Sequence, residues 1–340
     1  MKVFVYEHIT SGALIDQPLP SSLAYEGNEM LTAIVHDMAQ LIDIKLIILR
    51  DSRLKPLLDI IGNPHHQCSI IDNPPLFQLH YASAMNNADA VIIIAPETNG
   101  LLQTLQQSVL NHGKQLLGCQ PLATQVCTDK ALCYQQLTAN NITSPYTILA
   151  SEWLFNSFNS PSGFVVKPND GAGCIDTLFF AERSALESWL TSPSQTNQQN
   201  VIQPYIEGNA LSLTVLSDQH ASCLLAINQQ YIKLAKGQFS FHGCCVNGIV
   251  EAQFSLLKAT DLIQKIDHAI AGLWGFIGID LIVTNDETYV VDINPRVTTA
   301  YVGLNESLNL NPAKLLLTMK KHGLPTLPIS THRKAIEVLI

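Results

Sequence analysis

The chain has 340 residues, of which 47% are hydrophobic and 14% are charged, and its formal net charge is -9. This length predicts two or three packed subdomains, and the apolar content provides ample material for their cores. The negative charge argues against a general nucleic-acid binder, because such proteins need a basic face.

The chain shows no feature of a membrane or secreted protein. No apolar run approaches the length of a bilayer, and residues 2–6 begin the chain without a cleavable signal pattern. The eight cysteines have neither metal-site spacing nor the pattern of a secreted disulfide framework. We therefore expect a cytoplasmic protein, with no membrane partner, whose cysteines are reduced and mostly buried.

The first third of the chain alternates short apolar strands with helical patterns, which predicts a parallel sheet with helices on both faces. Such sheets bind ligands beyond the carboxyl ends of their strands, so the loops that begin at Glu7 and at Pro96 are candidate site loops. No G-x-G-x-x-G follows the first strand, which disfavours a dinucleotide dehydrogenase. We predict strands at 2–6, 45–49, 68–71 and 90–95, and helices at 28–41 and 101–112.

The pattern changes from about residue 123. Asp129 is a candidate N-cap for a helix that has ended before Pro145, and the polar stretch 191–200 reads as a surface loop or mobile connector. Strands at 163–167, 201–205, 211–216 and 223–227 predict a mostly antiparallel sheet, followed by a helix at 257–273.

Two apolar runs separated by the polar residues 285–287 predict a β-hairpin with a three-residue loop. If Thr284 pairs with Thr288 across that loop, Asp280 lies directly opposite Asp292. Opposed like charges destabilise a sheet unless something lies between them.

A metal ion is the simplest remedy for this opposition. Asn294 projects from the same face as Asp292, so two carboxylates and an amide oxygen share one patch. Oxygen ligands that leave coordination positions for phosphates suit magnesium, with manganese as an alternative. An exposed hairpin with ordinary surface acids is the competing interpretation, but the apolar flanking residues disfavour it.

Lys167 closes an apolar strand and precedes a loop that contains Gly171 and Gly173. Glycines let backbone N–H groups approach an anion, and a lysine beside them supplies the charge that phosphate binding uses. A Lys-Pro-x-x-Gly-x-Gly loop is by itself a weak signal. A plain turn with a lysine that extends to solvent explains it equally well.

The order of these features resembles that of the ATP-grasp superfamily over residues 123–317. The resemblance implies an α/β and α+β protein, in which an N-terminal parallel-sheet (pre-ATP-grasp) domain precedes a two-subdomain ATP-grasp fold. The features in order are Asp129-Lys130, Lys167 with its glycine loop, residues 203–208, Asp280, and the Asp-x-Asn-x-Arg run 292–296. The expected domains are 1–122, 123–205 and 206–330, with a C-terminal tail at 331–340.

The same resemblance implies a role for each matching residue toward ATP and magnesium. Arg296 would neutralise charge on the transferring phosphoryl group, and Lys167 would act with it. The implied nucleotide-binding residues are Lys130, Lys167, Asn169, Gly171, Gly173, Gln203, Tyr205, Ile206 and Asn294, and the implied metal ligands are Asp280, Asp292 and Asn294. Two positions depart from the family pattern: Ala210 replaces a glutamate that often holds the ribose, and Asp292 is one methylene shorter than the common glutamate.

A narrower resemblance is to the tyramine-glutamate ligase group of methanofuran biosynthesis. It is carried by Glu7 with residues 10–12, by 26–31 and 95–100, and above all by the run 291–304. It implies an ADP-forming ligase that joins glutamate to tyramine or tyrosine through an acyl phosphate. An ATP-grasp ligase with another acceptor, such as a dipeptide or glutamate-tail ligase, and a non-catalytic nucleotide-binding module remain alternatives, and a homo-oligomer is left open.

Three further polar residues lie where they could face an acceptor substrate. Lys233 and Lys236 flank the glycine-interrupted segment that contains His242. Each of the three is explained equally well as a surface or structural residue, so the sequence leaves their contact with substrate open.

Overall fold

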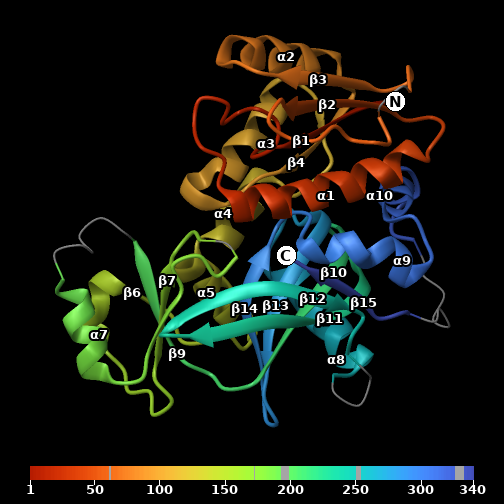
Figure 1. The fold of residues 1–340 in the computed structure, drawn as a ribbon. Coiled ribbons are helices and arrows are strands. Elements are labelled where there is room, and N and C mark those ends of the chain that lie inside the picture. The colour runs from red at the N-terminus through yellow and green to blue at the C-terminus, as the bar shows by residue number, and fades with distance from the viewer. Residues whose placement is uncertain (61–62, 172, 193–198, 250–253, 326–332) are drawn as a thin grey trace.

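The computed structural model describes residues 1–60, 63–171, 173–192, 199–249, 254–325 and 333–340. The chain forms a parallel sheet near its N-terminus and a larger antiparallel sheet from the remainder (Figure 1). The predicted change of sheet type is therefore confirmed. The centre of the predicted connector, residues 193–198, lies outside the described residues.

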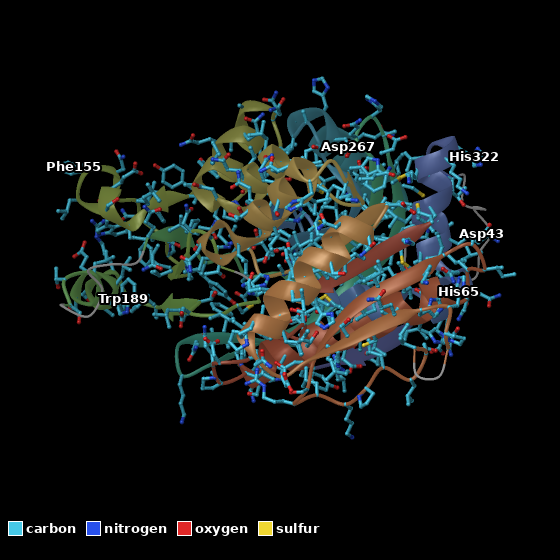
Figure 2. All side chains as sticks on the ribbon, turned by 90° about the horizontal axis from the view of Figure 1, so that it is seen from above. Asp43, His65, Phe155, Trp189, Asp267 and His322 are labelled. Atoms are coloured by element: carbon cyan, nitrogen blue, oxygen red, sulfur yellow. The ribbon has the colours of Figure 1, made fainter. Side chains whose placement is uncertain are left out.

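Five parallel strands form the N-terminal sheet in the order β3-β2-β1-β4-β5. Alternation along β1 places Val3 and Val5 in the core beneath α1, whereas Phe4 and Tyr6 join the core beneath α2 and α3. Helices on both faces follow, as predicted, and α2 lies across the strands when the molecule is seen from above (Figure 2). The elements are β1 Lys2–Glu7, α1 Ser21–Ala39, β2 Lys45–Asp51, β3 Gln67–Ile71, α2 Pro74–Asn87, β4 Ala90–Ile94, α3 Leu101–Asn111 and β5 Gln115–Leu116.

Two helices of this domain differ from the prediction. Helix α1 begins at Ser21 rather than at residue 28, since Pro20 precedes it without a side-chain cap that would mark its start. Helix α2 was not predicted, because it buries only Ala84 and Met85 among its described residues and so lacks a clear apolar stripe. Its start was nonetheless readable, since Asn73 caps the helix by accepting from Leu76 N at 2.9 Å.

The larger sheet has ten strands, in the order β14-β13-β10-β11-β12-β8-β7-β9-β6, with β15 paired to β12. It divides into a small lobe of β6 to β9 and a large lobe of β10 to β15, joined at the Gln238–Leu178 pair. The strands are β6 Ile148–Leu149, β7 Phe164–Pro168, β8 Leu178–Phe180, β9 Asn200–Pro204, β10 Asn209–Asp218, β11 Ser222–Ala235, β12 Gln238–Val246, β13 Trp274–Val283, β14 Thr288–Asn294 and β15 Ile336–Leu339.

Each lobe has a core of its own. In the small lobe Trp153, Phe164 and Ile202 pack with Leu186, and the outer residues Phe155 and Trp189 lie far from the N-terminal sheet (Figure 2). In the large lobe one sheet face packs on α8, as Leu213 and Ile279 do on Ile263. The helices are α4 Pro121–Thr128, α5 Lys130–Ala139, α6 Trp153–Asn156, α7 Arg183–Leu190, α8 Leu256–Ala269, α9 Leu304–Leu308 and α10 Pro312–His322.

The N-terminal domain packs firmly on the large lobe. A single core combines residues of α1, such as Ile34 and Met38, with Leu316 of α10 and Tyr301. Tyr301 OH also donates to Asp37 Oδ2 of α1 at 2.8 Å. Helix α1 therefore lies between the parallel sheet and the large lobe (Figure 1).

The cysteines are reduced and mostly buried, as the composition predicted. All eight cysteines are free, and Cys119, Cys127, Cys133, Cys244 and Cys245 are buried. Of the helices described, none is both long and apolar enough to cross a membrane. The C-terminal segment contributes β15 to the sheet. The domain limits at 122, 205 and 330 stay predictions.

Candidate active site

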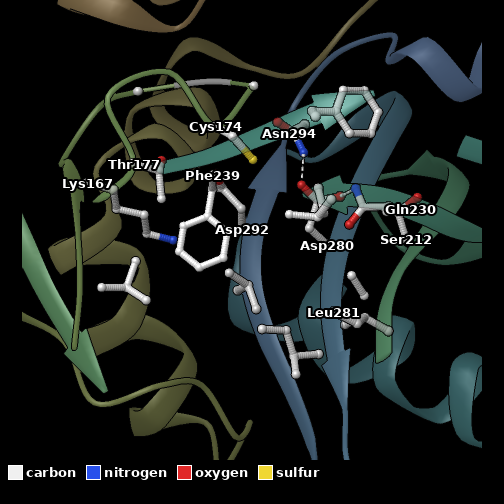
Figure 3. Close-up of a pocket in the computed structure, with 18 of the residues that line it drawn as sticks. Lys167, Cys174, Thr177, Ser212, Gln230, Phe239, Asp280, Leu281, Asp292 and Asn294 are labelled. Atoms are coloured by element: carbon white, nitrogen blue, oxygen red, sulfur yellow. Dashed lines mark hydrogen bonds between the residues drawn. The ribbon is translucent and has the colours of Figure 1, made fainter. Parts of the chain in front are cut away.

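A cavity of about 430 Å³ lies between the two lobes, and Glu26 of α1 forms part of its wall. Figure 3 shows Lys167 on one side of it and Asp280 with Gln230 on the other, with Asp292 between them. The predicted site residues that line the cavity are Lys130, Lys167, Gly171, Gly173, Gln203, Tyr205, Ile206, Asp280, Asp292, Asn294 and Arg296. Segments separated by as many as 166 residues, from 130 to 296, thus meet in one place.

The hairpin that carries the two aspartates forms, but its loop was predicted wrongly. Val283, rather than Thr284, pairs with Thr288, so the loop has four residues instead of three. The Thr284 hydroxyl accepts from the backbone N–H groups of Asp286 and Glu287 at 3.2 and 2.9 Å. These local bonds compete with strand pairing and make Thr284 part of the turn.

An extra residue in β14 restores the predicted opposition of the carboxylates. The register shifts at Val291, which has no partner across the hairpin, and Asp280 then pairs with Asp292. Asn294 lies on the same face, and its Nδ2 donates to Asp280 Oδ2 at 3.1 Å. Gln230 Nε2 of β11 donates to the other oxygen at 2.8 Å. Sequence reasoning missed Gln230, since nothing in β11 marks it as a partner of β13.

The Asp280 carboxyl is held at a site that disfavours its charge. Burial, and then the neighbouring charge of Asp292, raise the pKa of Asp280 to about 7, although hydrogen bonds from Asn294 and Gln230 act in the opposite direction. A cation between the two carboxylates would reverse this effect.

The donor set fits a hard cation that takes most of its ligands from elsewhere. Asp280 and Asp292 supply carboxylate oxygens and Asn294 an amide oxygen, which are the atoms that magnesium and manganese accept. Within the described residues no group of three or more His, Cys, Asp or Glu side chains could hold a metal. A metal held here would therefore depend on water or a bound substrate for its remaining ligands.

Two lysines line the cavity together with the aspartates. Lys130, at the start of α5, lies 3.2 Å from Asp292 Oδ2, and its Nζ donates to the Gly171 carbonyl at 2.7 Å. Lys167, at the end of β7, is 7% exposed. Burial lowers the pKa of Lys167 to about 8, and the charge of Asp292 partly offsets this shift. Both ammonium groups therefore point into the molecule, and neither is a solvent-facing surface charge.

The loop after Lys167 brings backbone groups to the cavity. Gly171 and Gly173 line the wall, and Gly173 adopts φ +64, a conformation that side chains disfavour. Asn169 is the predicted site residue that does not line the cavity. It is buried, its side-chain oxygen accepts from Ala131 N at 3.0 Å, and its carbonyl accepts from Lys130 N at 3.0 Å. Asn169 thus fixes the start of α5, which carries Lys130. Residue 172 lies outside the described residues.

Apolar side chains such as Ile206, Ile232 and Phe239 line another part of the cavity. Gln203 is buried and donates to Thr147 Oγ1 at 2.8 Å, and Tyr205 N–H donates to the Gly163 carbonyl at 2.9 Å. The Tyr205 ring packs edge-on against Phe179 with centroids 5.0 Å apart. Ala210 also lines this part of the wall.

Arg296 joins the large lobe to the N-terminal domain at the rim of the cavity. Its Nε and Nη2 donate to the two carboxylate oxygens of Glu97 at 2.7 and 3.1 Å. Glu97 follows β4, beside the end of β1, which is the ligand-binding edge expected of this sheet. A few residues on, Thr299 Oγ1 donates to Glu26 Oε1 at 2.5 Å. Neither acid could be matched with its partner from sequence, since 199 and 273 positions separate them.

Comparison with known protein families shows to which family the chain belongs. A family model described as an ATP-grasp domain matches residues 127–300, and one described as a pre ATP-grasp 3 domain matches residues 44–124. The chain belongs to the ATP-grasp family. Its two lobes with the cavity between them, and the α/β domain before them, are the expected architecture and are confirmed.

Individual relatives support this ATP-grasp assignment. A tyramine--L-glutamate ligase of Methanocaldococcus jannaschii is 28% identical over 232 residues, which cover 68% of this chain and 62% of that protein. A D-alanine--D-alanine ligase of Petrotoga mobilis is 24% identical over 52% of this chain and 60% of that protein. The match thus spans less than two thirds of either relative. A crystal structure of a putative ATP-grasp superfamily protein from Archaeoglobus fulgidus has a similar fold, with TM-score 0.69, 20% identity, and coverage of 100% and 99% of the two chains.

The sequence did not decide whether three polar residues contact the substrate, and the structure places all three outside the cavity wall. Lys233, Lys236 and His242 are exposed. Strand alternation explains why Lys233 and His242 point away from the cavity, because their neighbours Ile232 and Phe241 line it from the opposite face of the sheet. His242 pairs instead with Ser240 Oγ at 3.0 Å.

Proposed function

We propose that the protein is an ATP-dependent carboxylate–amine ligase that forms ADP and works through an acyl phosphate. The observation that carries the proposal is that three cationic side chains and a pair of opposed carboxylates line one cavity. Lys130, Lys167 and Arg296 supply the positive charge.

The first step transfers the terminal phosphoryl group of ATP. An oxygen of the substrate carboxylate attacks the phosphorus, the bond from phosphorus to the bridging oxygen breaks, and ADP leaves with the electron pair. Phosphoryl transfer leaves little covalent work to the protein, so positioning and charge neutralisation do most of it. We assign Lys130 and Lys167 to the phosphates and Arg296, with Lys167, to the moving phosphoryl group.

The second step forms the amide. The neutral amine nitrogen attacks the acyl carbon, the bond from that carbon to the phosphate oxygen breaks, inorganic phosphate leaves with the electron pair, and the nitrogen loses one proton. The acyl phosphate would hydrolyse if it were wet. The backbone at Gly171 and Gly173, which Lys130 holds through the Gly171 carbonyl, is suited to cover it.

Asp280, Asp292 and Asn294 would hold the metal. A magnesium ion bound by them supplies charge neutralisation on the phosphate oxygens during transfer. Manganese is the alternative, because it accepts the same oxygen donors.

The adenine would lie against Tyr205 and Ile206 in the apolar part of the cavity. The Tyr205 N–H is already bonded to Gly163, so we assign recognition to the Tyr205 carbonyl and the Ile206 N–H. Gln203 closes the same wall. Ribose recognition falls to groups other than position 210, where alanine offers no hydrogen bond.

For substrates we propose glutamate and a phenolic amine, tyramine or tyrosine, in the biosynthesis of a methanofuran-type cofactor in the cytoplasm. The relative from Methanocaldococcus jannaschii supports this choice, and the run 291–304 is its most specific part in this chain. The second candidate is a ligase for two amino acids, which the similarity to D-alanine--D-alanine ligase favours.

A matrix of acids and amines tests the proposal. The protein is incubated with ATP, magnesium, glutamate or D-alanine, and a panel of amines that includes tyramine, tyrosine and D-alanine, and released phosphate and ADP are measured. Tyramine or tyrosine with glutamate should give the fastest release. Faster turnover with D-alanine as both substrates would favour the second candidate. ATP binding without turnover on any pair would contradict the ligase proposal.

A further inference from the structure

The cavity contains one carboxylate for which the reaction above has no use. Its wall includes Glu26, Asp280 and Asp292, and the last two face each other on the hairpin. Glu26 comes from the N-terminal domain, from the first turns of α1. It therefore enters the cavity from a third element, independent of the hairpin and of the lysines.

Glu26 is held in place through one oxygen only. Thr299 Oγ1 donates to Oε1 at 2.5 Å, and Thr299 is itself buried. Over the described residues, no lysine, arginine or histidine forms an ion pair with Glu26 and no donor contacts its Oε2. Two cationic side chains that line the same cavity form ion pairs with other acids: Arg296 pairs with Glu97, and Lys130 pairs with Asp292.

The position of Glu26 matches the reacting end of the cavity. Thr299, which donates to Glu26, lies three residues after Arg296, and all three side chains line the cavity. Glu26 thus lies beside the segment that carries the proposed phosphoryl-binding arginine. Phe241, Cys244 and Ala300 line the cavity with it and add apolar surface. A half-buried carboxylate with a free oxygen beside apolar surface suits a ligand with an ammonium group on an apolar body.

We propose that Glu26 binds the ammonium group of the incoming acceptor amine, and so selects a cationic amine. The nitrogen then passes one proton to the Glu26 carboxylate, and its freed lone pair attacks the acyl carbon as phosphate leaves. This inference rests on the proposed ligase function and deepens it. Glu26 is a binding and specificity residue of the second step, and the first step does not require its charge.

Glu26→Gln is the variant of choice, because a glutamine oxygen can still accept from Thr299 while the charge is lost. Glu29→Gln is the matched control: it lies on the same helix, accepts from Asn28 Nδ2 at 3.2 Å, and is absent from the cavity wall. Two acceptors are compared with ATP and glutamate. One is tyramine, which is cationic, and the other is hydroxylamine, which is largely uncharged at mildly alkaline pH and traps acyl phosphates as hydroxamates.

The Glu26→Gln variant should show a KM for tyramine that is raised on the order of 10- to 100-fold, as expected when one charge-assisted contact is lost. Its rate of hydroxamate formation and its KM for glutamate should stay within about twofold of those of the wild type. Glu29→Gln should match the wild type with both acceptors.

Other outcomes overturn the inference. An unchanged KM for tyramine would show that the ammonium binds elsewhere. A raised KM for glutamate alone would assign Glu26 to the acid substrate. Equal loss with both acceptors would make its role structural or part of the first step. If the wild type forms neither amide nor hydroxamate, the ligase proposal fails first and the inference falls with it.

Discussion

At the scale of single residues, the side chains from Asn294 to Tyr301 are notable for their hydrogen bonds to acidic residues. Four of the five polar side chains in it contact an acid elsewhere in the chain. The pairs are Asn294 with Asp280, Arg296 with Glu97, Thr299 with Glu26, and Tyr301 with Asp37. Three of these acids belong to the N-terminal domain. The run thus links the proposed metal site to the domain interface.

Lys167→Met should nearly abolish turnover. Methionine keeps the buried stem but removes a charge that we assign to the phosphates, and the loss should amount to about 10²- to 10³-fold in kcat/KM for ATP. Initial rates and ATP affinity measure the effect. Lys233→Met is the control, because Lys233 is exposed and absent from the cavity wall. Unchanged affinity and turnover in Lys167→Met would remove Lys167 from the site.

Asp280→Asn should cost activity far more than stability. The variant loses a proposed metal ligand, which should lower the rate by at least ~100-fold at limiting magnesium, whereas it also relieves the repulsion with Asp292. Phosphate release is titrated against magnesium, and thermal unfolding is recorded in parallel. The metal assignment is wrong if the variant keeps wild-type activity when magnesium is scarce.

At the scale of elements, sequence periodicity was reliable where strands are regular. The alternation of side chains put Asp280, Asp292 and Asn294 on one face before the structure was known. The loop was predicted wrongly because Thr284 makes local hydrogen bonds instead of pairing with Thr288. The predicted pairing is therefore wrong by one residue next to the turn, and the bulge at Val291 restores it at Asp292. The final opposition was therefore predicted correctly through a register that was wrong near the turn.

The junction of β1 and α1 predicts a pH-dependent stability. Glu7 ends β1, is 3% exposed, and accepts from Thr10 N at 2.6 Å and Ile9 N at 3.2 Å. Burial, which outweighs these bonds, raises the pKa of Glu7 to about 7. The folded-state pKa lies above the unfolded one, so this carboxyl's contribution to stability is fully present below about pH 4.5 and is lost as the pH rises to about 7.

Glu7→Gln should remove that dependence. The difference in unfolding free energy between wild type and variant should shift by roughly 3 kcal/mol between pH 4.5 and pH 7, in the direction that disfavours the wild type at higher pH. Because other titrating groups cancel in the difference, denaturant unfolding of both proteins at several pH values measures it. Parallel curves across this range would mean that Glu7 titrates normally in the folded protein.

At the scale of the whole molecule, the sequence predicted the two sheet types and the order of the domains, but not how the domains meet. The contacts that join them, between Arg296 and Glu97 and between Tyr301 and Asp37, depend on packing of α1 against the large lobe. No local pattern encodes the partner of a side chain two hundred residues away. For the same reason Glu26 was missed as a site residue.

The Arg296–Glu97 pair should couple the two domains energetically. Its side chains are 11% and 5% exposed, so removal of one partner leaves a buried charge. Glu97→Ala should destabilise the protein by about 3 kcal/mol. A double-mutant cycle with Arg296→Ala, followed by denaturant unfolding, should show a coupling energy of at least ~1 kcal/mol. Additive effects would mean that the pair does not hold the domains together.

The central claim is that ATP activates a carboxylate as an acyl phosphate, and the path of one oxygen atom tests it most directly. Glutamate labelled with oxygen-18 in its side-chain carboxylate is supplied with ATP, magnesium and the amine that gives the fastest turnover. The account predicts ADP as the nucleotide product and one labelled oxygen in each inorganic phosphate, with Arg296→Ala slowing the transfer much more than it weakens ATP binding. AMP and pyrophosphate as products, or phosphate without label, would contradict it.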